Sequence, residues 1–418
     1  MIHPPTDVTA RPGPLLLDGL NNGPGLQAHQ RRYGPVPHLD SADLLALAHG
    51  GQVRGRGGAG FPFARKLDAV LSARRRRPSG RPVVIVNGAE GEPASAKDSA
   101  LLQRVPHRVL DGAAVAARAL SVRTVHVVTP GDRPWVGLAV RQAIAERHDG
   151  LRFHHHEAAP RFVAGQARAV IELISGREDL PVTAWAPEAF AGYHGRPTLL
   201  SNAESWAHLA MLAHHGLLRY AALGTPEEPG TTLLTVTTPP DPDGRVGSAI
   251  VVEVEHGRSV SDLLSDAALG APALIGGFHG SWFAPEQLGQ LTVSQLALRQ
   301  HGASLGAGAV MTLAGGGCPV AQTARIVDYL ADESAGQCGP CRFGLPSLAT
   351  QVRELARHRD TTQRLGELTG LVTGRGACAH PDGTARLVTS LLTRLPEQVQ
   401  AHLDRQCSCV AAELVRSA

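Results

Sequence analysis

Two cysteines stand three residues apart in the glycine- and proline-rich stretch ESAGQCGPCRFG, residues 333–344. Cys338 and Cys341 form a two-ligand turn of the kind that binds iron–sulfur clusters or zinc. Cys378 lies in a similar glycine-rich stretch one predicted helical hairpin later. If the two intervening helices are antiparallel, the three thiols meet at one end of a helical bundle. The spacing therefore predicts a metal or cluster site, because the strand–helix context of a thioredoxin-type redox pair is missing around Cys338.

The loop RGRGGAG, residues 54–60, contains four glycines and precedes a predicted helix. Glycines let a backbone approach a phosphate closely, and a helix N-terminus offers free N–H groups. Lys66 lies in that helix and is one of only two lysines in the chain. Since nearly all other basic residues are arginines, a flexible point charge is indicated at this position. We predict an anion site, although a glycine turn that only packs a strand against a helix has the same pattern.

A polar loop, NGAEGEP at residues 87–93, directly follows an apolar strand predicted over residues 82–86. Loops at the carboxyl ends of strands bind the ligands of open α/β sheets. Asn87, Glu90 and Glu92 supply an amide and two carboxylates, and the second lysine, Lys97, follows closely. This combination predicts hydrogen bonds to a polar cofactor.

The pattern of predicted elements divides the chain into four parts. Strands and helices alternate at first, which predicts a parallel sheet with helices on its faces. A small α+β module follows, and helical segments with short connections then predict a bundle. The fold class is therefore α/β, followed by an α+β domain and a helical bundle. The predicted parts are an irregular N-terminal arm over residues 1–39, the α/β domain over 40–225, the α+β domain over 230–314 and the bundle over 318–418.

Composition narrows the classes of function. A net charge of +3 over 418 residues gives no reason to expect a nucleic-acid partner. No stretch has the roughly 18 apolar residues of a membrane span, so direct membrane insertion is not expected. Six cysteines, all from position 318 onward, are too few and too unevenly placed for a secreted disulfide framework. We expect a cytoplasmic protein whose cysteines bind metal or take part in redox chemistry.

Taken together, the motifs resemble those of the NADH-binding flavoprotein subunit, known as the F subunit, of respiratory complex I. The same module occurs in related NAD-linked hydrogenases and formate dehydrogenases. The resemblance covers about residues 40–400 in the right order and includes GRGGAGFP, VNGAEGEPASAKD, RPTLLSNAES, ESAGQCGPCRFG and GACAH. It implies an FMN-binding α/β domain, a β-grasp-like soluble-ligand-binding domain and a helical bundle holding a [4Fe–4S] cluster. The family usually works with a small [2Fe–2S] or ferredoxin-like electron carrier.

By this resemblance, the cofactor-binding candidates of the α/β domain gather in four motifs. They are Gly55, Arg56, Gly57, Gly58, Gly60, Lys66, Asn87, Glu90, Glu92, Gly165, Ser201 and Asn202. Lys97 and Asp98 match the family motif without an assigned role. No side chain is expected to act as a catalytic acid or base, since the cofactors carry the chemistry.

The protein departs from the family mainly on the NADH side. Ala89 replaces an Asp, and Gly165-Gln-Ala167 stands where the family has Gly-Glu-Glu at the nicotinamide site. In an ungapped alignment, Ala184 and Pro187 replace a Lys and a Phe of the dinucleotide pocket. Ribose hydrogen bonds and ring stacking are each worth on the order of 1 kcal/mol or more. Losing two or three of them predicts roughly a hundredfold weaker NADH binding.

The cluster motif has also changed. In the family pattern ESCGQCTPC the first cysteine ligates the cluster, and Ala335 takes its place. The resemblance thus leaves Cys338, Cys341 and Cys378 as metal ligands, and predicts a [3Fe–4S] cluster or a [4Fe–4S] cluster with another fourth ligand. Cys318, His380, Cys407 and Cys409 are the candidates for that ligand, or there is none. Cys318 ranks lower because a helix of about 15 residues would place it roughly 22 Å away.

The leading hypothesis is a flavin and iron–sulfur electron-transfer oxidoreductase subunit that uses NADH poorly. One alternative is a cofactor-poor structural or ligand-binding relative whose cysteine site holds zinc or nothing. Another is an NADH dehydrogenase flavoprotein with a rebuilt NADH pocket.

Overall fold

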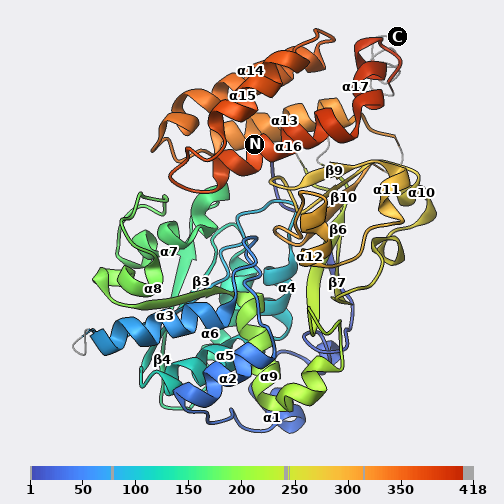
Figure 1. The fold of residues 1–418 in the computed structure, drawn as a ribbon. Coiled ribbons are helices and arrows are strands. Elements are labelled where there is room, and N and C mark those ends of the chain that lie inside the picture. Colours follow the sequence, from blue (N-terminus) through green and yellow to red (C-terminus); the bar gives the residue numbers. More distant parts are fainter. Residues whose placement is uncertain (1, 77–79, 240–242, 244, 314–315, 408–418) are drawn as a thin grey trace.

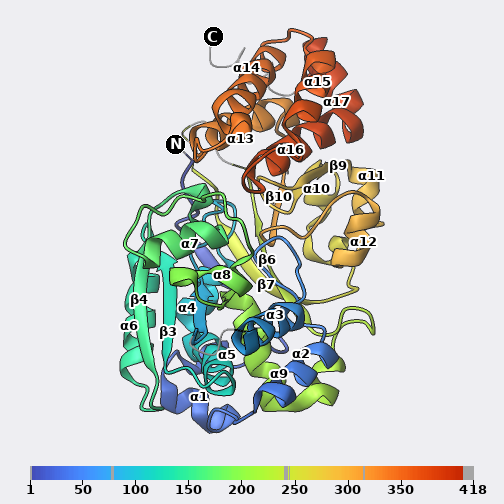
Figure 2. The ribbon, with the colours of Figure 1, turned by 60° about the vertical axis from the view of Figure 1, so that its left-hand side comes forward.

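The computed structural model of the protein describes residues 2–76, 80–239, 243, 245–313 and 316–407. Two sheets, each with its own helices, lie side by side, and a helical bundle covers one end of both (Figures 1 and 2). In this described part, no helix has both the length and the apolar character needed to cross a membrane. The predicted fold class, α/β with a helical C-terminal region, is confirmed.

The first sheet has four parallel strands in the order β4-β3-β2-β5. Its central strand has the sequence VVIVN and is apolar on both sides, as strands buried on both faces of a parallel sheet are. Val84 and Val86 pack into one core, while Val83 and Ile85 pack into another on the opposite face. The strands are β2 (Val83–Asn87), β3 (Thr124–Pro130), β4 (Arg152–Ala158) and β5 (Thr198–Asn202).

Helices cover both faces of this sheet. Helices α5 and α9 pack against each other and against β2, and α7 covers the other face with Val170 and Ile171. Helix α9 begins where Asn202 caps it by accepting from the Glu204 amide, a common N-cap arrangement. The helices of this part are α2 (Ser41–Gly50), α3 (Phe63–Arg76), α4 (Lys97–Arg104), α5 (Pro106–Ala119), α6 (Pro134–Ala145), α7 (Ala167–Ile174), α8 (Glu188–Ala191) and α9 (Ala203–Ala221).

The second sheet has six strands in the order β1-β7-β6-β10-β8-β9. Strands β6 and β7 form an antiparallel pair, and β10 returns parallel to β6. Short helices, α10 to α12 and the 3-10 helix η4, share one apolar core with these strands. The elements are β6 (Thr231–Thr237), β7 (Ala249–Glu255), η4 (Val260–Leu263), α10 (Asp266–Leu269), β8 (Ala273–Ile275), β9 (Ser281–Phe283), α11 (Pro285–Leu288), α12 (Gln295–Gln300) and β10 (Ala309–Thr312).

The C-terminal part is helical, as the sequence predicts. Its first four helices form a bundle with one apolar core, and a fifth helix packs against α13 and α16. A π-helical turn over Pro340–Gly344 leads into α14. The helices are α13 (Pro319–Asp332), α14 (Leu345–Ala356), α15 (Thr362–Val372), α16 (His380–Arg394) and α17 (Pro396–Leu403).

The first 39 residues are not irregular throughout, which corrects one expectation. Strand β1 (Val8–Ala10) pairs in parallel with β7 at the edge of the second sheet, and helix α1 (Leu26–Tyr33) packs near α5. Between these elements, the partly buried carboxylate of Glu253 on β7 accepts three backbone N–H bonds from residues 15–17 at 2.7–3.2 Å. The arm is ordered by partners more than 230 residues away, which no local pattern in its own sequence can specify.

Replacing Glu253 should loosen this arm. The variant Glu253→Ala leaves three amides and the Thr231 hydroxyl, which donates at 2.6 Å, without their acceptor. Each buried group left unpaired costs about 1–3 kcal/mol, so we expect a loss of several kcal/mol and faster proteolysis within the first 39 residues. Glu255→Ala on the same strand is the control, since among the described residues its carboxylate accepts a single long bond of 3.5 Å, from Gly224. Equal protease resistance of the two variants would contradict this role.

Candidate functional site

A cavity of about 290 Å³ lies where the three parts of the protein meet. One wall is the carboxyl end of the parallel sheet, where Asn87 of β2 and Asn202 of β5 stand in register. The second sheet and the first turn of α16 supply the opposite wall. The lining residues are Arg56, Gly57, Gly58, Ala59, Asn87, Glu90, Gly91, Glu92, Ser95, Lys97, Asp98, Phe162, Gly165, Gln166, Asn202, Gly276, His279, Ser304, Gly306, Ala307, Ala379, Gly383 and Arg386.

The glycine loop forms one rim of the cavity. The Gly55 amide donates to the Phe61 carbonyl at 2.8 Å, which closes the loop on itself. Gly58 has a φ of +103°, a conformation that side chains rarely tolerate. A Cβ at Gly57 or Gly58 would meet protein atoms only at 3.6 Å or more, so it would occupy cavity space. The loop therefore leaves room for a ligand against bare backbone.

The loop after β2 is held by Glu90. This buried carboxylate accepts from the amides of Asp98 and Ser99 at 2.8 and 2.9 Å and from Arg133 at 2.5 Å. Burial alone would raise the pKa of Glu90, but Arg133 and these hydrogen bonds lower it overall. Glu90 is thus ionised, and its hydrogen bonds hold the loop after β2 in place. Its φ of +41° is unusual for a residue with a side chain, and the fixed contacts maintain it.

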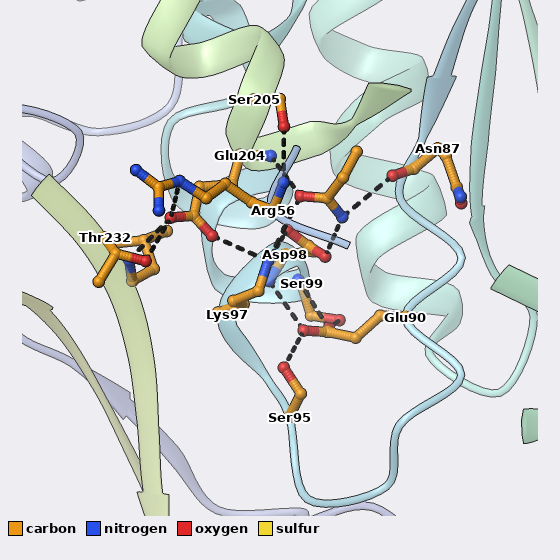
Figure 3. Close-up of polar contacts among 12 residues, drawn as sticks. Arg56, Asn87, Glu90, Ser95, Lys97, Asp98, Ser99, Glu204, Ser205 and Thr232 are labelled. Atoms are coloured by element: carbon orange, nitrogen blue, oxygen red, sulfur yellow. Dashed lines mark hydrogen bonds and ion pairs between the residues drawn. The ribbon is translucent and has the colours of Figure 1, made fainter. Parts of the chain in front are cut away.

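A network of buried charges lies beneath the cavity (Figure 3). Lys97 is 2% exposed and Glu204 is fully buried. The Lys97 Nζ atom lies 2.8 Å from Asp98 Oδ1 and 2.9 Å from Glu204 Oε2. Burial disfavours a charged lysine, but the two carboxylates raise the pKa of Lys97 overall. Asn202 Nδ2 donates to Asp98 Oδ2 at 2.6 Å and completes the network.

Glu204 also joins the two sheets. Its Oε1 atom accepts from the Leu233 amide at 2.9 Å and the Thr232 hydroxyl at 3.1 Å, both at the start of β6. The Arg56 guanidinium lies 3.7 Å from the same oxygen, and its backbone amide donates to Ser205 at 2.9 Å. The network therefore fixes the glycine loop, α9 and β6 relative to one another around the cavity.

The structure gathers eight of the twelve predicted cofactor-binding residues in the cavity lining. Gly55 and Gly60 adjoin it in a small neighbouring hollow. Lys66 and Ser201 are not in the lining. Lys66 instead donates to the Leu200 carbonyl at 3.1 Å and lies 3.7 Å from Glu188, while burial lowers its pKa. The lysine of the cavity is Lys97, to which the motif assigned no role. The lining residues near 276 and 304 carried no sequence signal at all.

The three predicted cysteine ligands meet at the end of the bundle nearest the cavity. Burial raises the pKa of Cys341 and of Cys378, and the charge of the Cys338 thiolate raises both further. Burial works against ionisation of Cys338 as well, but backbone amides of Ala377 and Cys341 lower its pKa overall. The Cys338 thiolate thus acts on both other thiols.

Three thiols at one end of a helical bundle are the kind of donor set that holds an iron–sulfur cluster. Two sulfurs on one tetrahedral zinc ion, with Zn–S bonds of about 2.3 Å, stand about 3.8 Å apart. Among the residues that the structure describes, two groups of three donor atoms lie within 4.8 Å of one another, and Cys338, Cys341 and Cys378 are not one of them. An iron–sulfur cluster binds its thiolates on different iron atoms and so spaces them more widely. The donor set fits a cluster.

Cys318 and Cys407 lie away from this site, and His380 lies beside Cys378 but both of its ring nitrogens have other partners. Cys318 caps the opposite end of α13 and contacts His402 at 3.3 Å. Cys407 contacts the same histidine at 3.2 Å. His380 uses Nε2 to donate to the Leu330 carbonyl at 2.7 Å, and its Nδ1 atom lies 3.1 Å from His279. Cys409 lies outside the described residues.

The cavity shares a wall with the loop that carries Cys378. Ala379, directly after Cys378 in the chain, lines the cavity together with Gly383 and Arg386 from α16. His279, another lining residue, contacts His380 at 3.1 Å across the boundary between the second sheet and the bundle. The residue that follows Cys378 in the chain therefore borders the cavity directly.

Comparison with protein families gives two matches that coincide with these two sites. Residues 49–211 match the Nuo51 FMN-binding domain, and residues 321–402 match the iron–sulfur binding region of NADH-ubiquinone oxidoreductase F. The protein belongs to the F-subunit family of complex I. The cofactors of this F-subunit relative are FMN and an iron–sulfur cluster, and the matches support electron transfer between flavin and iron–sulfur groups.

Similar curated F subunits extend over nearly the whole sequence. An F subunit of the NADH-quinone oxidoreductase of Rhizobium meliloti (strain 1021) is 28% identical over 94% of this chain and 96% of its own length. The mitochondrial NADH dehydrogenase [ubiquinone] flavoprotein 1 of Dictyostelium discoideum is 27% identical over 84% of this chain and 77% of its own length. A solved NAD⁺-reducing [NiFe]-hydrogenase has the same fold, with a TM-score of 0.78 over 94% of this chain and 68% of that one, at 24% identity.

The buried lysine should be essential for stability. Lys97→Met leaves Asp98 and Glu204 buried without their cation, and breaking such a pair costs about 3–5 kcal/mol. Arg141→Met is the matched control, because its pair with Glu157 is about half exposed on both sides and should cost no more than about 1 kcal/mol. Chemical unfolding of both variants measures the difference. A Lys97→Met variant as stable as the control would contradict the role of the network.

Glu92 should make stability depend on pH. Burial raises the pKa of this carboxyl to about 7, above its ordinary value near 4.5. The folded state therefore binds more protons than the unfolded state between these values, and the free energy of unfolding should fall by about 3 kcal/mol as pH rises from 4.5 to 7. Glu92→Gln should remove this decrease. Unfolding of both proteins at pH 5 and pH 8 tests it, and identical pH profiles would refute it.

Proposed function

We propose that this F-subunit relative works in the cytoplasm as the flavin and iron–sulfur electron-transfer subunit of a redox complex. FMN would lie in the cavity, and a cluster on Cys338, Cys341 and Cys378 would take electrons from it. The observation that carries the proposal is the shared wall, in which Ala379 lines the cavity directly beside Cys378. This closeness favours electron transfer without a further carrier.

The cavity fits a flavin nucleotide. The bare backbone of the glycine loop faces one rim, where Asn87 and Asn202 also line the cavity, and Gly165 leaves space on the other. When bound, FMN supplies exchange between two-electron and one-electron transfer. The residues of the protein bind and orient it and exclude water. The acidic side chains of the lining already make hydrogen bonds or ion pairs with other protein groups, so none of them is proposed as a catalytic acid or base.

We further propose that NADH is a poor donor for this protein. The carboxylates of the lining are Glu90, Glu92 and Asp98. Glu90 and Asp98 belong to buried networks, and Glu92 accepts from the amides of Ala94 and Phe278 at 3.1 and 2.8 Å. No carboxylate in this lining is thus left for a nicotinamide ribose. Gln166 lines the cavity where the family has a Glu, which agrees with weak binding.

One observation favours a second candidate, in which NADH binds in a rebuilt pocket. Phe61, Trp185 and Phe190 are 44%, 86% and 41% exposed. They lie on or beside α3 and α8, which pack together next to the glycine loop. Exposed aromatic rings of this kind can stack on a nicotinamide or an adenine and would replace the lost phenylalanine at Pro187.

Anaerobic titration distinguishes these candidates. We expect flavin bleaching by a reduced ferredoxin-like or [2Fe–2S] carrier, the partner class we propose, at concentrations where NADH and NADPH have little effect. NADH should need concentrations roughly a hundredfold above the micromolar range. Rapid bleaching by micromolar NADH that is lost in Trp185→Ala would establish the rebuilt pocket instead. Colourless protein that releases no flavin on denaturation would reject both.

The cluster proposal has its own test. Cys341→Ser should lose the cluster, seen as loss of iron and of the EPR signal, while FMN stays bound. Ala335→Cys restores the family's cysteine beside Gly336, whose amide contacts the Cys341 sulfur. We expect this variant to shift the cluster toward a stable [4Fe–4S] form. Cys378→Ser serves as a second ligand variant. Iron content unaffected in both serine variants, or a site that takes up only zinc, would contradict the assignment.

A further inference from the structure

A second group of possible metal ligands lies at the other end of the bundle. Cys318, at the N-terminus of α13, His402, on α17, and Cys407, just after α17, bring their donor atoms within 4.8 Å of one another. Cys318 and His402 are 4% and 1% exposed. Helix α13 spans 14 residues, or about 21 Å, so this group is separate from the proposed cluster.

The imidazole of His402 is oriented as a metal ligand. Its Nε2 atom lies 3.2 Å from the Leu355 carbonyl, which can only accept, so Nε2 carries the proton. The lone pair of Nδ1 then points to both sulfurs, at 3.3 Å for Cys318 and 3.2 Å for Cys407. His358 stacks on the ring at 4.4 Å and holds its plane. Metal-binding histidines are typically fixed in this way, through a backbone carbonyl on the other nitrogen.

The distances suit a single ion. With Zn–S bonds of about 2.3 Å and Zn–N bonds of about 2.0–2.1 Å, tetrahedral geometry places sulfur and nitrogen about 3.6 Å apart. The observed contacts are within a few tenths of an ångström of this value. Thiolate and imidazole ligands together select Zn²⁺ over hard cations such as Mg²⁺ or Ca²⁺.

We propose that Cys318, His402 and Cys407 form a mononuclear Zn²⁺ site in the reduced protein. Cys407 is disulfide-bonded in this structure, so the site opens on reduction. A phosphine reductant carries this out: the S–S bond breaks, two thiols form from the protons of water, and the phosphine becomes its oxide. Binding of Zn²⁺ then displaces the thiol protons of Cys318 and Cys407. The ion would join α17 to the start of α13, independently of the proposed electron transfer.

Metal analysis of the whole protein, loaded with FMN and cluster and kept under a phosphine reductant, tests this site. We expect one Zn²⁺ per molecule after dialysis, with an affinity measured against a chromogenic chelator. Cys318→Ala and Cys407→Ser should each weaken Zn²⁺ binding at least about 100-fold, while iron and flavin contents stay unchanged. The matched control is Cys341→Ser, which should lose iron and keep Zn²⁺.

Retained iron and flavin also show that the two variants fold. If Cys318→Ala fails to fold, Cys407→Ser decides alone, because its side chain is only half-buried and lies near the C-terminus. A reduced wild-type protein that takes up no Zn²⁺ would overturn the proposal. Zn²⁺ that persists at full affinity in Cys407→Ser would overturn it as well.

Discussion

The contact between Lys97 and Glu204 is the interaction on which the rest of the site depends. It places a cation and an anion, both almost fully buried, between the parallel sheet and the second sheet. Such a pair needs polar partners around it, and Asp98, Asn202 and Thr232 supply several of them. Because these partners come from separate segments of the chain, satisfying the pair also fixes the shape of the cavity. The network keeps the cavity open on the side where the glycine loop leaves bare backbone.

A second constraint acts at the opposite wall. Glu92 accepts from the Phe278 amide of the second sheet's domain. Phe162 donates its amide at 2.9 Å to Glu333, which precedes the loop of Cys338 and Cys341. His279 and His380 make a third contact across this boundary. The bundle is therefore held against the cavity by hydrogen bonds from both other parts. A cluster at Cys338, Cys341 and Cys378 would gain a fixed distance to the flavin from the same contacts.

Local sequence patterns predicted the strands, the bundle helices and the two loops that line the cavity. The parallel strands follow from uninterrupted apolar runs such as VVIVN, and the bundle helices from their periodicity. The glycine loop and the Asn87 loop carry motifs that require a particular backbone, and both reach the cavity. Lys66 is not in the lining of the cavity, and its Nζ atom donates to the Leu200 carbonyl instead. Lys97 could have been recognised as the alternative, since it is the only other lysine and follows a carboxylate-rich loop.

The features that the sequence did not predict depend on contacts between distant segments of the chain. The pairing of β1 with β7, the lining residues near 276 and 304, and the place of His279 beside His380 all arise from tertiary packing. Cys318 illustrates the opposite case. Helix length alone predicted that it lies far from the cluster cysteines, and the structure places it at the other end of α13. Its neighbours His402 and Cys407 could not have been found in this way.

Electron transfer from the flavin to the three-cysteine cluster is the central claim, and flash reduction of the flavin tests it most directly. The flavin and cluster absorption bands are followed anaerobically after the flash, in the wild-type protein and in Cys341→Ser. We expect reoxidation of the flavin and reduction of the cluster to proceed with one rate and equal electron counts in the wild type. In the variant the flavin should stay reduced. A wild-type flavin that remains reduced beside an oxidised cluster would contradict the claim.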